Sequence, residues 1–162
     1  MTEPTTVRDA LERFLSINGF TMEAYDAPKV AIPFGPFTIH LPNSEGRKAI
    51  VRLHDIHHVV TNYGTDLAGE AEIGAWELRA GCTNLAGYVY NLMAVTLGVF
   101  IAPLRTLRAF LDGRGAMTLY RLGVPYDELL TMTVAELRER LSIPADGAAH
   151  EPARLNAAAP AS

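Results

Sequence analysis

The chain has 162 residues, a length that suits a single domain with an ordinary hydrophobic core. Hydrophobic residues make up 49% of the sequence and charged residues 20%, a globular composition that leaves room for an apolar pocket. The net charge is -4 and no Lys/Arg-rich run is present, which excludes the electrostatic pattern of a nucleic-acid-binding protein. The single cysteine excludes an internal disulfide, and the first residues lack signal-peptide or transit-peptide character, so we expect a cytoplasmic protein.

The first third of the chain predicts a short helix and then an extended segment. Thr6 and Asp9 provide the N-terminal cap of an amphipathic helix that Gly19 ends. Between residues 25 and 43 four prolines prevent a long helix. The pattern there favours two extended stretches and a small β-hairpin with its turn near Phe34.

The centre of the chain predicts a pair of helices. Capping residues at positions 43–44 and 65–66 begin two helices that end near residues 61 and 80, each followed by a glycine. Because the connection between them is short, we expect the two helices to lie antiparallel.

The second half of the chain predicts further helices and a tail. Residues 85–102 form an apolar run at the lower length limit of a membrane span, but its glycines and Asn91 favour a buried helix. Shorter helices are expected at 104–111, 117–122 and 134–141, the last with a capping box from Thr133 and Glu136. We therefore expect one all-α domain over residues 1–144, with the minor hairpin near its start, and a disordered Ala/Pro-rich tail over 145–162.

The predicted helix pair concentrates residues that bind metals. On the first helix His54 and His58 lie one turn apart on one face, and Asp55 borders that face. Glu70, about one turn after the connection, lies at a similar height to His58 if the helices are antiparallel. Two imidazoles and two carboxylates would balance a divalent cation, for which zinc is the first choice and iron or manganese the next.

Three neighbouring residues complete the predicted site. Gly74 follows Glu70 by one turn, and its missing side chain would let the two helices approach closely. Glu77, one turn further along, faces the same contact between the two predicted helices. His57 points to one side and is expected to support the ligands. The alternative is a solvated face whose histidines and carboxylates pair with nearby arginines, namely Arg47, Arg52 and Arg79.

Other metal-protein classes share only part of this pattern. His54 to His58 match the H-x-x-H-H box of di-iron desaturases, but those enzymes need several boxes and only His40 and His150 remain. Adjacent His54 and Asp55 also occur in HD phosphohydrolases, which need an upstream histidine on a helix, whereas His40 lies in Pro-rich sequence. The glutamate base of an H-E-x-x-H zincin is missing. We expect His40 and His150 to have no ligand role.

A fourth class fits the spacing completely. The pattern H-D-x-x-H, followed after eleven residues by E, resembles the metal motif of the Coq-four family of ubiquinone-biosynthesis proteins; here it is formed by His54, Asp55, His58 and Glu70. The resemblance covers residues 50–143. Other segments similar to that family are Gly69-Glu70, Ala75-Trp76-Glu77 and residues 134–141.

This resemblance implies an all-helical fold, a zinc-type ion on those four residues and an apolar cavity for a polyprenyl chain. The family is associated with removing the carboxyl group from a prenylated benzoate ring, with replacement by hydroxyl, and with organising a membrane-associated complex. We therefore expect a metal-dependent decarboxylase that acts on a prenylated aromatic acid beside other quinone-biosynthesis proteins. Peripheral membrane contact and a homodimer are both compatible with the sequence.

In this hypothesis the ion binds an oxygen of the aromatic acid and stabilises the negative charge that develops as carbon dioxide leaves. His57, Glu77 or Tyr63 would handle a proton, and His57 and Glu77 are our catalytic candidates. Four residues of the apolar run could line a pocket for the apolar tail, although ordinary core positions suit them better: Tyr88, Tyr90, Leu92 and Met93. The rival hypotheses are a non-catalytic isoprenoid-binding scaffold with a structural ion and a metal-dependent hydrolase.

Overall fold

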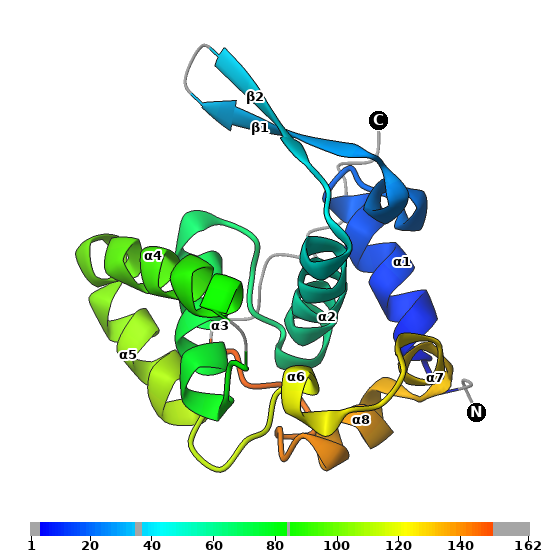
Figure 1. Cartoon of the computed structure of the whole chain (residues 1–162). Helices are drawn as coiled ribbons and strands as arrows, with labels where there is room; N and C mark the ends of the chain where they lie inside the picture. Colours follow the sequence, from blue (N-terminus) through cyan, green and yellow to red (C-terminus); the bar gives the residue numbers. More distant parts are fainter. Residues whose placement is uncertain (1–3, 35–36, 84, 151–162) are drawn as a thin grey trace, which may run out of the picture.

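The computed structural model describes residues 4–34, 37–83 and 85–150, and most of these residues are helical. The helices, drawn in Figure 1, are α1 (Val7–Ile17), η1 (Met22–Asp26, a 3-10 helix), α2 (Glu45–Thr61), α3 (Leu67–Ala80), α4 (Leu85–Ile101), α5 (Pro103–Asp112), α6 (Leu119–Leu122), α7 (Tyr126–Thr131) and α8 (Val134–Arg140). None of the helices within the described ranges is long and apolar enough to cross a membrane.

The helices begin where capping residues predicted that they would. The side chains of Thr6, Ser44 and Asp66 each accept a hydrogen bond from the backbone N–H three residues later. Thr133 and Glu136 form the expected reciprocal capping box at the start of α8. Local side-chain chemistry therefore sets these four helix starts. By contrast, α7 was not predicted, because its six residues are too few to show a helical period.

An antiparallel pair of strands precedes α2. Strand β1 (Lys29–Phe34) pairs with β2 (Phe37–Pro42), in a register that places Ile32 opposite Ile39 and Ala31 opposite His40. In Figure 1 the pair extends away from the helices. This is the segment in which the sequence indicated extended structure. The turn expected around Phe34 and Gly35 falls partly on residues 35 and 36, which lie outside the described residues.

The helices form two groups that meet where α2 faces α3. In the first group α1, α2, α7 and α8 pack together, and in the second α4 and α5 pack on α3 (Figure 1). The buried apolar side chains nevertheless form one cluster, which runs from Leu11 and Ile56 through Trp76 to Leu137. A seam between two packed groups can hold polar side chains away from water while the core excludes solvent on both sides.

Helix α4 corrects one expectation from the sequence. The apolar run does form a helix, but only its narrow face of Gly87, Asn91 and Gly98 is buried. This face packs on α3, where a side chain at Gly74 would contact the backbone oxygen of Asn91 at 3.2 Å and the Cβ of Ala94 at 3.3 Å. Gly74 therefore allows α4 to approach α3; the expectation that it serves the contact with α2 is wrong. The large apolar side chains of α4 point outward.

The chain after α8 also differs from the expected disorder. Residues 145–150 fold back onto the end of α2, where the backbone N–H of Ala148 donates to the carbonyl of Thr61 at 2.8 Å. The guanidinium of Arg138 donates to the carbonyl of Ala145 at 2.6 Å. These hydrogen bonds satisfy backbone groups at a helix end, which sequence composition does not reveal.

Gly98 provides a test of the packing between α3, α4 and α5. A Cβ at this position would overlap the Cβ of Ala71 in α3 and lie 2.6 Å from Oγ1 of Thr106 in α5. We expect Gly98→Ala to lower the free energy of unfolding by about 1–3 kcal/mol in urea denaturation, because the three helices must move apart.

The matched control is Gly46→Ala in the first turn of α2, where nothing lies within 4 Å of the added Cβ. That substitution should raise the free energy of unfolding by about 0.5–1 kcal/mol, because alanine loses less backbone entropy than glycine. Equal effects of the two substitutions would contradict the close packing at Gly98.

Candidate metal centre

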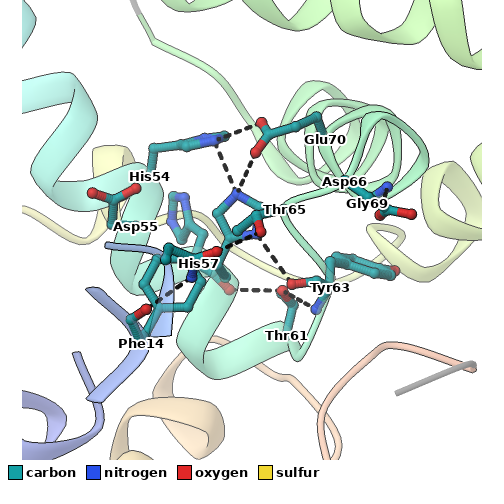
Figure 2. Close-up of polar contacts among 12 residues, drawn as sticks. Phe14, His54, Asp55, His57, Thr61, Tyr63, Thr65, Asp66, Gly69 and Glu70 are labelled. Carbon is teal, nitrogen blue, oxygen red and sulfur yellow. Dashed lines mark hydrogen bonds and ion pairs between the residues drawn. The ribbon is translucent and has the colours of Figure 1, made fainter. Parts of the chain in front are cut away.

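Three metal-binding side chains converge at the seam between α2 and α3. His54 and His58 come from α2 and Glu70 from the first turn of α3, and one ligand atom of each lies within 4.8 Å of the others. Figure 2 shows the carboxylate of Glu70 facing the ring of His54. These three residues could hold a metal ion, as the spacing in the sequence predicted for them.

The distances within this group suit a small tetrahedral ion. The Nε2 atoms of His54 and His58 are 3.2 Å apart; that of His54 lies 3.5 Å from Oε2 of Glu70, and that of His58 lies 3.5 Å from Oε1 of the same carboxylate. Ligand atoms bound at about 2.0–2.1 Å to a tetrahedral zinc ion lie about 3.4 Å apart. The two Nε2 atoms and the Glu70 carboxylate therefore lie at separations close to those of ligands around such an ion.

The other ring nitrogen of each histidine is held by a hydrogen-bond acceptor. Nδ1 of His54 lies 2.9 Å from Oε1 of Glu77, and Nδ1 of His58 lies 3.1 Å from the carbonyl oxygen of Tyr63. A carbonyl oxygen only accepts hydrogen bonds, so Nδ1 of His58 carries the hydrogen and its Nε2 is left with a lone pair. This second contact fixes the tautomer and orientation of a metal-binding imidazole.

Glu77 is the acceptor around which the buried polar groups are arranged. In addition to His54, its Oε1 contacts Nδ1 of His57 at 2.7 Å and accepts from the hydroxyl of Tyr120 at 3.1 Å. Its Oε2 accepts from the side-chain amide of Asn91 at 2.8 Å. The side chain of Glu77 is 1% exposed, and four donors compensate for removing its charge from water.

Both nitrogens of His57 are used inside the protein. Nδ1 contacts Glu77, and Nε2 accepts a hydrogen bond from the backbone N–H of Leu119 at 2.8 Å. The ring is fully buried, between Trp76 and Tyr120. The expectation that His57 supports the ligands agrees with these contacts, which are those of a positioning residue. A catalytic role for His57 and Glu77 stays a prediction.

Burial and neighbouring charges set the pKa values of the cluster. Burial lowers the pKa of His58 to about 4, and the charge of His54 adds to this shift. Burial also lowers the pKa of His57. Burial opposes protonation of His54 too, but the carboxylates of Glu77 and Glu70 outweigh it and hold the His54 pKa well above its usual value. In the protein without an ion, the protonated ring of His54 therefore lies between the carboxylates of Glu70 and Glu77. The same two carboxylates would attract a metal cation.

Asp55 lies outside the converging group. Its Oδ2 accepts a hydrogen bond from the hydroxyl of Tyr25, the buried residue of η1. Burial raises the pKa of the Asp55 carboxyl. The structure thus brings together three of the four residues predicted as ligands, and ligation by Asp55 stays a prediction.

The arginines that could neutralise the carboxylates have contacts elsewhere. Arg52 pairs with Asp26 at 2.7 Å, and Arg47 donates to Oδ1 of Asn43 at 3.0 Å. The guanidinium of Arg79 lies over the ring of Phe110. The alternative of a solvated face paired with these arginines does not describe the site.

The remaining side chains singled out from the sequence make contacts away from His54, His58 and Glu70. The hydroxyl of Tyr63 donates to Asp112 at 3.3 Å, and His150 contacts the same carboxylate at 3.0 Å. His40 lies in β2. The predicted core or pocket positions on α4 are instead exposed, with exposed fractions of 45–66%: Tyr88, Tyr90, Leu92 and Met93.

Sequence reasoning missed three residues that support the site: Tyr25, Asn91 and Tyr120. A signal existed for Asn91, because an amide within an apolar helix needs a polar partner when it is buried. No signal connected the two tyrosines to the histidines, since they lie far away in the sequence.

Comparison with known proteins adds no family to these observations. No family model matches the sequence, no curated protein matches it and no solved structure matches it. The resemblance to the Coq-four family therefore rests on the motif residues themselves, and membership stays a prediction.

Glu77→Ala tests whether one carboxylate supports the whole seam. The substitution leaves the buried donors of His57, Asn91 and Tyr120 without their acceptor, so we expect the free energy of unfolding to fall by about 3–5 kcal/mol. Urea denaturation of the metal-free protein measures this change.

Glu12→Ala is the matched control, because Glu12 lies on the exposed side of α1. It should change the free energy of unfolding by less than about 0.5 kcal/mol. A Glu77→Ala effect as small as that of the control would show that the hydrogen bonds to Glu77 contribute little.

Proposed function

We propose that the protein is a metal-dependent enzyme whose divalent ion is held by His54, His58 and Glu70. The observation that carries this proposal is the arrangement of the two Nε2 atoms. They lie 3.2 Å apart and beside the Glu70 carboxylate. The Nδ1 atom of His54 contacts Glu77, and the Nδ1 atom of His58 contacts the Tyr63 carbonyl. Two lone pairs that face each other repel unless a proton or a cation lies between them.

An open coordination position supports a catalytic rather than a structural ion. Structural zinc sites have four protein ligands, whereas catalytic sites have three and keep the fourth position for water or substrate. Three ligands converge here, and Asp55 is engaged with Tyr25. Solvent reaches the site from one side, because the side chains of Glu70 and His54 are 41% and 22% exposed.

For the reaction we propose decarboxylation of an aromatic acid that carries an apolar prenyl chain. The substrate class comes from the resemblance to the Coq-four motif. A divalent ion in this site would supply a Lewis acid for a carboxylate or phenolic oxygen and stabilise negative charge as carbon dioxide leaves. The ring carbon keeps the electron pair of the broken C–C bond and takes a proton from solvent. The protein's part is to hold the ligands, and Glu77 orients His54 and His57 for this purpose.

A metal-dependent hydrolase is the second candidate, and the ligand set favours it. Two histidines and one glutamate also hold the zinc ion of catalytic hydrolase sites such as that of thermolysin. The two candidates share the metal site and differ in the bond that is broken, so the substrate that is consumed distinguishes them.

Metal content tests the first step. Purified protein dialysed against trace zinc should carry close to one ion per chain by elemental analysis. His58→Ala should lower zinc affinity more than about 100-fold, because losing a ligand costs more than losing a residue that supports one. His150→Ala should retain the ion, because His150 contacts Asp112 and lies outside the ligand group. Protein without any stoichiometric transition metal would rule out the proposal.

Turnover tests the reaction. Zinc-loaded protein should release carbon dioxide from a prenylated hydroxybenzoate, and the rate should fall to background in His58→Ala and after chelation. Carbon dioxide release and hydrolysis of phosphate or carboxylate esters should be followed in parallel. Ester hydrolysis without carbon dioxide release would assign the hydrolase function. If zinc-loaded protein shows neither activity, that result would favour a non-catalytic scaffold.

A further inference from the structure

Helix α4 presents an apolar stripe to solvent on the side opposite α3. We call the following residues the outer stripe: Leu85, Val89, Leu92, Thr96 and Val99. Its four apolar side chains are 49–80% exposed, and α4 contains no charged residue. A helix that is apolar on all sides is normally covered on all sides. Since α3 covers only one face of α4, we expect another surface to cover the outer stripe.

We propose that the outer stripe is the surface through which a second copy of the chain binds, with α4 of one copy packed against α4 of the other. A two-fold axis would place the same stripe on both copies, as in most homodimers. This inference does not rest on the metal site or on the proposed reaction.

The spacing of the outer stripe identifies another helix as its partner. Positions 85, 89, 92, 96 and 99 alternate in steps of four and three, which is the heptad spacing of helices that pack along their length. A 3.5-residue repeat drifts by only about 20° per heptad around an α-helix, so over the length of α4 one seam keeps facing a partner helix that crosses at a small angle. Among the described helices, α4 and α2 share the greatest length of 17 residues, so the seam can continue over several turns.

The polar residue in the outer stripe does not oppose its burial. The hydroxyl of Thr96 donates to the carbonyl of Leu92 at 2.7 Å within the same helix. Its donor therefore already has a partner, and covering it costs no hydrogen bond. The rest of the stripe is aliphatic.

Neighbouring side chains enlarge this apolar surface. Further exposed apolar residues are Met93 and Phe100 of α4 and Leu104, Leu107 and Leu111 of the adjacent α5. Helices α4 and α5 pack together on α3 (Figure 1). With the stripe, these side chains form the apolar part of a surface that can be compared with the roughly 800 Å² that each partner buries in a stable complex.

The charges favour a protein partner over a lipid surface. Helices that lie on membranes are amphipathic and carry Lys or Arg beside the apolar face, which attract anionic headgroups. The uncharged α4 lacks this pattern, and the whole chain has a net charge of -4. In the adjacent α5, Arg105 forms a two-point contact with the buried carboxylate of Glu72, and Arg108 is the exposed basic residue.

Sedimentation velocity of the full chain over a range of concentrations tests the proposal. Wild-type protein should sediment as a dimer at micromolar concentration. The double substitution Leu92→Glu with Val99→Glu places two charges on the stripe of each copy, and we expect at least a tenfold weaker dimer. Both side chains are more than half exposed in the single chain, so circular dichroism and the unfolding temperature should stay near wild type.

Phe20→Glu is the matched control, because Phe20 is 61% exposed but lies after α1, away from α4 and α5. This variant should dimerise like wild type. A wild-type chain that stays monomeric at every concentration would overturn the proposal. It would also be overturned if the dimer persisted unchanged in the double variant. Wild-type protein that stays monomeric and floats with phosphatidylcholine or phosphatidylserine vesicles would assign the outer stripe to a lipid surface instead.

Discussion

A buried carboxylate that must keep its charge constrains the rest of this structure. Glu77 of α3 receives hydrogen bonds from His54 and His57 of α2, from Asn91 of α4 and from Tyr120 of α6. An ionised carboxylate away from water is tolerated only when such donors surround it. The two helical groups are therefore joined by hydrogen bonds to one side chain, and the three residues that could hold a metal ion lie directly beside this junction.

The local features of the fold could be predicted, because they depend on residues close together in the sequence. Caps at Thr6, Ser44 and Asp66 gave the helix starts, and the helical period placed His54 and His58 on one face. The partners of Glu77 could not be predicted in the same way. They come from segments many residues away, and only the packing of whole helices brings them together.

The environment of α4 shows a different limit. The sequence indicated an apolar helix, and burial in the core of the same chain was the natural interpretation. Hydropathy reports that a surface avoids water, but it does not report what covers that surface. In the structure α4 uses two small residues, Gly87 and Gly98, and the polar Asn91 to pack on α3, so that its large side chains remain outside.

The anchoring of both imidazoles has a consequence for ion size. His54 contacts Glu70 of the first turn of α3 through one nitrogen and Glu77, two turns later, through the other. The backbone positions of Glu70 and Glu77 are separated by a rise of about 10 Å along α3, and both side chains reach the ring of His54, so the ring has little freedom to move outward. Calcium binds at 2.3–2.6 Å and prefers six to eight oxygen ligands, so it would require a wider ligand triangle. If His54, His58 and Glu70 bind an ion, the hydrogen bonds that orient the two histidines would therefore also favour small over large divalent ions.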